Sequence, residues 1–180
     1  MLLSKCGLAH AKALEMGIFP TRILLAIDGP EEAELATRKA VELANEIDSE
    51  LYVVHVGLLP NFLMGDLGTV GYDSILYEQI EREYSELFRK LVWQVKVSGG
   101  TVAGAYLRMG EVDLEIVGLA KELGADLIVM GCRGRHGIRR MIGGSVSDAV
   151  IQHAPCPVLV VRSPQSAEAP ERAIDQPGKG

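Results

Sequence analysis

Short runs of apolar residues recur along the chain, and longer amphipathic stretches separate them. A short apolar run without polar alternation is typical of a strand that is buried on both faces of a sheet. Such runs predict strands at residues 23–27, 51–56, 102–107, 127–130 and 157–161. In the stretches between them, apolar residues return every three or four positions, which predicts helices that bury one face.

The predicted helices have recognisable starts and stops. Asp28 can cap the first helix, and Pro30 suits its first turn. A second helix is expected over residues 73–97, a third between Gly110 and Gly124, and a fourth from Gly144 onward. The side chains expected to be buried are Ala36, Ala40, Leu43, Ala44 and Ile47 on the first helix, Ile80, Tyr84, Leu87, Leu91 and Val95 on the second, and Ile116, Val117, Ala120 and Leu123 on the third.

Strands that alternate with helices predict right-handed crossovers between parallel strands. The expected fold class is therefore α/β, with a single doubly wound parallel five-stranded sheet and helices on both faces, a Rossmann-like arrangement. This domain is expected to span residues 20–162. Residues 1–19 are interpreted as an N-terminal extension with one short helix. Residues 163–180 carry prolines and almost no apolar side chains, which indicates a disordered tail.

Composition and charge argue against several classes of protein. The chain has 180 residues, of which 48% are hydrophobic, as is ordinary for one globular domain. Its net charge of -6 is unfavourable for non-specific nucleic-acid binding, which needs a basic surface. No apolar run is long enough to cross a membrane, and the first residues lack the apolar centre of a signal peptide. Three scattered cysteines fit reduced thiols rather than a zinc site. We therefore expect a cytoplasmic protein that binds neither nucleic acid nor membranes.

A loop rich in glycine and basic residues stands out in this acidic chain. It follows the predicted strand at 127–130, and its glycines are Gly131, Gly134, Gly137, Gly143 and Gly144. Glycine permits a close approach of the backbone to a ligand. Gly144 and Ser145 then open a helix, whose first N–H groups and dipole favour an anion, and Ser145 and Ser147 add hydroxyl donors. These features predict a nucleotide-phosphate loop.

Two further stretches are expected to meet this loop. Ligands of open parallel sheets bind beyond the carboxyl ends of the strands. Asp28, the residues after Val56 and the loop after Met130 each follow such an end. The pattern therefore predicts one crevice at that edge of the sheet.

The same residues resemble a universal stress protein domain of the ATP-binding subgroup. The motif of that subgroup is Gly, two residues, Gly, nine residues, Gly, then Ser or Thr, and here it is Gly131, Gly134, Gly144 and Ser145. The resemblance runs from about residue 21 to residue 162. It includes Asp28 with Gly29 after the first strand, residues 53–56 of the second strand, and residues 153–162 at the end. It implies an adenine nucleotide alpha hydrolase-like form of the α/β fold.

The resemblance also implies roles for individual residues. Asp28 would hydrogen-bond the nucleoside, and the Val56 backbone would meet the edge of the adenine. Met130 and Gly131 would line the nucleoside pocket, and Gly134 would let the loop approach the phosphates. The residues that would hold the phosphates are Gly144, Ser145, Val146 and Ser147. Mg would be bound largely through the phosphates of ATP rather than by side chains of the chain. The family is usually dimeric, and the last strand, residues 158–161, would pair across the two-fold axis.

Several other motifs of nucleotide chemistry are absent from the sequence. It has no Walker GxxxxGK[ST] loop, no GxGxxG after the first strand and no GxSxG nucleophile elbow. No clear general base lies near the loop, so we assign no catalytic residue. The favoured interpretation is an ATP-binding regulatory or stress-response protein. The alternatives are a slow ATPase or self-phosphorylating enzyme acting through Ser145 or Ser147, and a dimeric module whose pocket holds another ligand.

Overall fold

The computed structural model describes residues 20–27, 30–58, 74–131 and 146–162 of the chain. Several expectations lie outside these residues. They are the short helix in the N-terminal extension (1–19), the disordered tail (163–180), the capping role of Asp28 and the course of the glycine-rich loop over residues 132–145.

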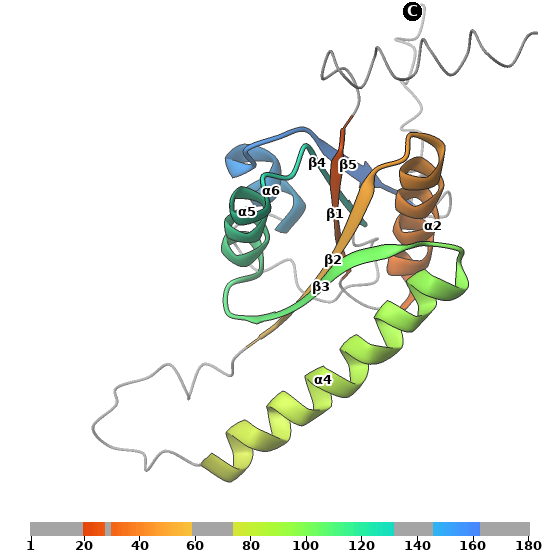
Figure 1. Ribbon diagram of the computed structural model, residues 1–180. Coiled ribbons are helices and arrows are strands. Elements are labelled where there is room, and N and C mark those ends of the chain that lie inside the picture. Colours follow the sequence, from red (N-terminus) through yellow and green to blue (C-terminus); the bar gives the residue numbers. More distant parts are fainter. Residues whose placement is uncertain (1–19, 28–29, 59–73, 132–145, 163–180) are drawn as a thin grey trace, which may run out of the picture.

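A sheet of five parallel strands forms the centre of the domain (Figure 1). The strands are β1 (Arg22–Ala26), β2 (Glu50–Gly57), β3 (Val102–Met109), β4 (Leu127–Gly131) and β5 (Val158–Val161). Their spatial order is β3-β2-β1-β4-β5. The apolar runs in the sequence predicted these strands to within two residues at each end, and the α/β fold class with a doubly wound parallel sheet is confirmed.

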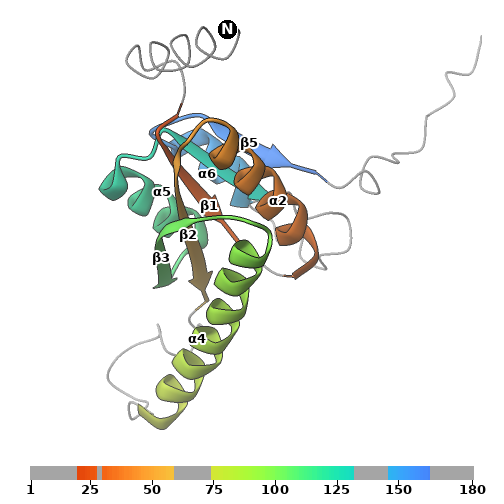
Figure 2. The same cartoon turned by 45° about the vertical axis from the view of Figure 1, so that its right-hand side comes forward.

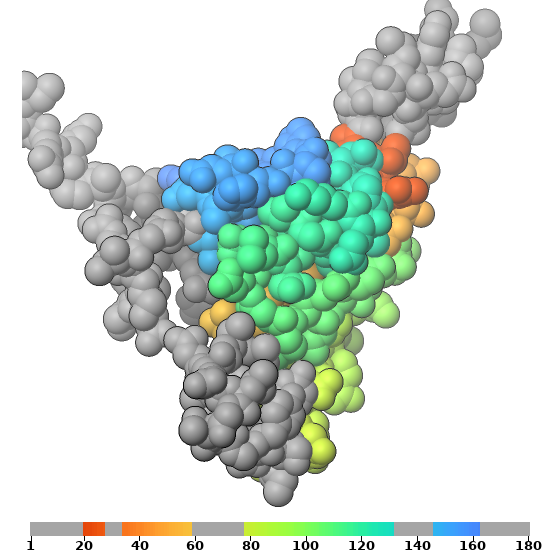
Figure 3. Space-filling view, turned by 90° about the vertical axis from the view of Figure 1, so that its left-hand side faces the viewer, coloured from red at the N-terminus to blue at the C-terminus, as the bar shows by residue number. Residues whose placement is uncertain are grey.

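Helices cover both faces of this sheet. They are α2 (Pro30–Glu46), α4 (Ser74–Val97), α5 (Val112–Leu123) and α6 (Val146–His153). Figure 1 shows α2 on one side of the sheet with α5 and α6 on the other. Seen from the second side, α5 and α6 form a continuous layer of side chains (Figure 3). Pro30 begins α2, and Gly124 ends α5 with a φ angle of 60°, both as the sequence predicted.

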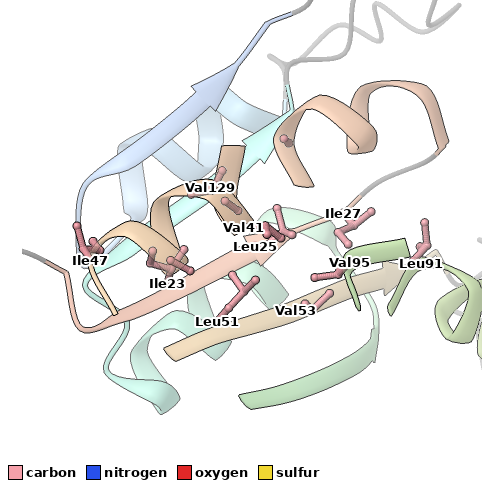
Figure 4. Packing of buried hydrophobic residues seen from close by; sticks show 13 residues of the cluster. Ile23, Leu25, Ile27, Val41, Ile47, Leu51, Val53, Leu91, Val95 and Val129 are labelled. Carbon is pink, nitrogen blue, oxygen red and sulfur yellow. The ribbon is translucent and has the colours of Figure 1, made fainter. Parts of the chain in front are cut away.

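Each central strand buries side chains on both of its faces. On β1, Ile23 and Leu25 face α2 and α4, where Leu51 and Val53 of β2 join them (Figure 4). The intervening residues Leu24 and Ala26 face α5 and α6, and they pack with Ile116, Leu119, Ile128 and Val150. Because both faces are covered, the inner strands have no polar alternation, which explains the uninterrupted apolar runs in the sequence.

The long helix α4 contacts the sheet through only part of its length. Leu91 and Val95 in its C-terminal half are buried in the core, as predicted. Leu87 was also expected to be buried, but 36% of its surface is exposed, and Phe88 packs against the core instead. The face of α4 that meets the core runs through Tyr84, Phe88, Leu91 and Val95, and Leu87 lies at its margin. The N-terminal turns of α4 extend beyond the sheet (Figure 2). Periodicity thus gives the apolar face of a helix, but not which residues at the margin of that face are covered.

A carboxylate joins the first and fourth strands at the amino edge of the sheet. The Asp126 side chain accepts hydrogen bonds from the Thr21 hydroxyl at 2.7 Å, from the Thr21 amide at 2.9 Å and from the Arg22 amide at 3.1 Å. These bonds hold the pKa of Asp126 below its ordinary value, with the Thr21 hydroxyl contributing most and partial desolvation opposing it. Asp126 therefore has a structural role at the edge opposite the predicted ligand site.

Candidate functional site

The order in which the strands are added to the sheet reverses beside β1. From β1 the chain builds β2 and then β3 on one side, and it then returns to build β4 and β5 on the other. Ala26 of β1 and Met130 of β4 are register partners at the carboxyl ends of these two strands. This is the topological switch point of the sheet, where open α/β sheets form a crevice that binds ligands.

The strand ends that were expected to meet do lie next to each other. β1 is hydrogen-bonded to β2 on one side and to β4 on the other, and all three strands run in the same direction. The chain therefore leaves the sheet at the same edge after Ile27, after Gly57 and after Gly131. Three separate stretches of sequence leave one edge of the sheet, as predicted.

Some of the predicted site residues lie in the described part of this edge. Val56 and Met130 are each 6% exposed, and their side chains pack in the core beneath α5 and α6. These two side chains are therefore engaged in the core. Gly131 ends β4 and pairs with Val161 of β5.

Val146 and Ser147, which were predicted to hold phosphates, are the first two residues of the helix α6. Val150, one turn further on, is fully buried, and α6 packs against α5. These contacts fix the start of α6, just as the sheet fixes Gly131. Gly131 and Val146, the described residues on either side of positions 132–145, therefore both belong to packed elements. The helix start supplies N–H groups and a dipole that favour an anion.

Four predicted site residues, Asp28, Gly134, Gly144 and Ser145, lie outside the described residues. Each is close in sequence to an anchored position, since Asp28 follows Ile27 and Ser145 precedes Val146. Their assigned roles stay predictions.

On the β2 side of the edge, a histidine contacts the end of the neighbouring strand. His55 is 4% exposed, and its Nδ1 atom lies 2.7 Å from the carbonyl oxygen of Ile27. The ring of Tyr84, from α4, lies against the His55 ring, with centroids 5.8 Å apart. The Tyr84 hydroxyl accepts a hydrogen bond of 3.1 Å from the Leu58 amide. The sequence predicted both side chains to be buried and gave neither a role at the site, because hydrogen bonds between strands depend on the register of the sheet.

Gly57 allows these elements to come together at the end of β2. A Cβ atom at this position would lie 2.5 Å from the Met109 sulfur and 3.0 Å from the Tyr84 ring. The Gly57 carbonyl also accepts a hydrogen bond of 3.0 Å from the Gly110 amide, which joins β2 to the end of β3. The edge is thus closely packed on the β2 side.

Reactive side chains and metal ligands are sparse in the described ranges. Burial, and secondarily the charge of Asp126, raises the pKa of the Cys156 thiol, which favours packing over nucleophilic chemistry. Among the residues that the structure describes, no three His, Cys, Asp or Glu side chains gather as metal ligands. Likewise, no helix in those ranges is long and apolar enough to cross a membrane.

These observations define an α/β protein with a candidate ligand site at the switch point of a parallel sheet. A family model places the chain more narrowly. The model of the universal stress protein family matches residues 20–162, and the chain belongs to this family.

Relatives and solved structures agree with this assignment. The chain is 37% identical over 145 residues to the universal stress protein YxiE of Bacillus subtilis, covering 78% of this chain and 98% of that protein. It is 33% identical over 149 residues to a universal stress protein of Methanocaldococcus jannaschii, covering 80% of this chain and 83% of that protein. A universal stress protein of Archaeoglobus fulgidus, solved in complex with dAMP, has a similar structure with a TM-score of 0.52 and 28% identity, covering 78% and 96% of the two chains.

Proposed function

We propose that this protein binds ATP at the carboxyl edge between β1 and β4 and acts as a nucleotide-dependent regulator in a cytoplasmic stress response. The observation that carries the proposal is the switch point at the ends of β1 and β4. Residues 131–145, which connect the end of β4 to the start of α6, contain the complete glycine motif. A 28% identical universal stress protein solved with dAMP supports an adenine nucleotide as the ligand.

The proposed binding mode follows the order of elements at the edge. The nucleoside lies between the ends of β1 and β2, where Asp28 hydrogen-bonds it and the Val56 backbone meets the adenine. Met130 and Gly131 line the pocket on the β4 side. The phosphates extend over Gly134 to Gly144, Ser145, Val146 and Ser147 at the start of α6, and Mg is held mainly through the phosphates.

Regulation is favoured over rapid catalysis because no general base has been identified beside the phosphates. In this account ATP occupancy shifts the equilibrium between two conformations of the loop, and a protein partner binds one of them more tightly. The enzymatic alternative, slow hydrolysis or self-phosphorylation through Ser145 or Ser147, uses the same loop and is tested separately below.

We further propose that two copies pair through β5. This strand forms one edge of the sheet, and Leu159 on it is 41% exposed. An exposed apolar edge strand favours pairing with another strand, and a second copy would satisfy its backbone groups.

The test of ATP binding is a calorimetric titration of nucleotide-stripped protein with MgATP. We expect saturable binding at one site per chain. Gly144→Glu adds a side chain and a negative charge to the phosphate loop and is expected to abolish binding. Gly118→Glu is the matched control, because a Cβ at Gly118 on α5 meets no atom within 4 Å.

The outcomes of this titration are distinct. Binding by the wild type and by Gly118→Glu, lost in Gly144→Glu, supports the proposal. Absence of heat together with absence of co-purified nucleotide would contradict it and favour a dimeric module with another ligand.

A further inference from the structure

We propose that His55 and Tyr84 are positioning residues for the nucleoside half of the site. Together they hold the end of β1 and the first residue after β2 in fixed relative positions. We call this pair the His55–Tyr84 bracket. The inference rests on the proposed nucleotide function and adds two residues that contact backbone rather than ligand.

The first contact fixes the peptide that leads to Asp28. His55 Nδ1 lies 2.7 Å from the Ile27 carbonyl oxygen, and the Ile27 amide donates to the Val54 carbonyl at 2.9 Å. Both polar groups of Ile27 are thus held by β2, although Ile27 lies one residue beyond β1. The Ile27 carbonyl shares one planar peptide unit with the next amide nitrogen, so a bond to this oxygen orients the entry to Asp28.

The second observation concerns the two nitrogens of the His55 ring. A carbonyl oxygen only accepts, so Nδ1 is the donor in the bond to Ile27. Nε2 is buried and has no hydrogen-bond partner in the part of the chain that the structure describes. A polar ring with one unsatisfied nitrogen is unfavourable in the core compared with an apolar side chain. The bond to Ile27 is the contribution of histidine that an apolar residue could not replace.

The third observation extends the bracket to the β2 side. The Tyr84 ring packs on the His55 ring at a centroid distance of 5.8 Å, and its hydroxyl accepts from the Leu58 amide at 3.1 Å. A Cβ atom at Gly57 would lie 3.0 Å from the Tyr84 ring, so glycine permits this close approach. Leu58 is the first residue after β2, so the hydroxyl holds the backbone where the chain leaves the sheet beside the proposed adenine position.

The bracket therefore predicts an effect on affinity that is separate from its effect on stability. His55→Leu removes the donor to Ile27 and leaves that carbonyl unpaired, but it also removes the buried Nε2 and fills the position with an apolar side chain. Because these effects oppose each other, the protein is expected to melt close to the wild-type temperature. Its affinity for MgATP is expected to fall about tenfold, the order expected for one lost hydrogen bond. A purely structural histidine would not produce this combination.

The experiment compares variants of the full chain by calorimetry with MgATP and by thermal melting. His55→Asn keeps an N–H donor close to the Nδ1 position and is expected to recover most of the affinity. Tyr84→Phe keeps the ring but loses the hydroxyl, and it is expected to weaken binding about threefold. Leu119→Ala, on the buried face of α5, is the control that lowers stability and leaves affinity unchanged.

Two results would overturn the inference while the proposed function stands: wild-type affinity in both His55→Leu and Tyr84→Phe, or equal losses in His55→Leu and His55→Asn. If the wild type itself binds no MgATP, the proposed function fails and the bracket has no nucleoside to position. Because the wild-type titration is read first, the two failures are distinguishable.

Discussion

Ala26 and Met130 are register partners in neighbouring parallel strands, although more than a hundred residues separate them in the chain. The chain completes α2, β2, α4, β3 and α5 before β4 returns to the side of β1. Their pairing brings the ends of β1 and β4 together, and α6 is the next element of the chain after β4. The site proposed above depends on this relationship.

Asp126 is expected to stabilise the fold in a pH-dependent manner. Its folded-state pKa lies below the ordinary value of 3.8, so its stabilisation is present above that value and is lost as the pH falls through the lower folded-state pKa. Asp126→Asn should lower the free energy of unfolding by about 1 kcal/mol at neutral pH, a modest value because solvent screens the site. Urea unfolding from pH 7 to pH 3 should show the difference shrinking. The control Glu86→Gln lies on the exposed face of α4, and an equal pH-dependent loss there would refute the assignment.

Gly57→Ala tests the close packing at the end of β2. The added methyl group would meet the Met109 sulfur and the Tyr84 ring, so these side chains must shift. We expect a loss of about 1–3 kcal/mol in unfolding free energy, as in other overpacked positions. Gly118→Ala is the matched control. Its Cβ meets open space within a helix, and the substitution should stabilise the protein by about 0.5–1 kcal/mol. Equal melting temperatures for the two variants would argue against a packing role for Gly57.

Leu159→Lys tests the proposed pairing through β5. A charge at the centre of an apolar strand–strand interface should shift the protein from dimer to monomer in analytical ultracentrifugation. Leu114→Lys, on the exposed surface of α5, carries the same change away from β5 and should keep the wild-type mass. A monomeric wild type, or a dimer that persists in Leu159→Lys, would contradict the proposed interface.

ATP turnover separates the regulator from the enzyme. We expect purified protein to bind MgATP and release phosphate slowly or not at all, because no general base has been identified beside the loop. The assay measures phosphate release and protein phosphorylation over hours at saturating MgATP. Activity that disappears in both Ser145→Ala and Ser147→Ala would instead establish the enzymatic alternative.

The sequence predicted the fold well because each inner strand is covered on both faces. An apolar run such as Leu127–Met130 has few other structural explanations once glycines and amphipathic stretches flank it. The burial of Leu87 was predicted wrongly, because periodicity gives the apolar face of α4 but not which residues at its margin the sheet covers. Tyr84, about one turn nearer the N-terminus, still contacts His55 of β2, so Leu87 is exposed because of its position around the helix.

The site was predicted less completely than the fold. The convergence of the strand ends after Ile27, Val56 and Met130 followed from the parallel topology. The contact between His55 and the Ile27 carbonyl could not be predicted, because it requires the register of β1 against β2. A one-residue slip would turn His55 to the other face of the sheet. The roles of Asp28, Gly134, Gly144 and Ser145 rest on the sequence motif and stay predictions.

The central claim concerns where the nucleotide binds, and amide chemical-shift mapping tests it most directly. The measurement adds MgATP to isotopically labelled protein and follows the backbone amides. Perturbed amides are expected to cluster at Ile27, Leu58, Gly131 and Ser147, at the carboxyl edge of the sheet. Thr21 and Arg22, about 17 Å away at the other end of β1, should be unaffected. Shifts centred on Thr21, Arg22 and Asp126, with the carboxyl edge unchanged, would contradict the account.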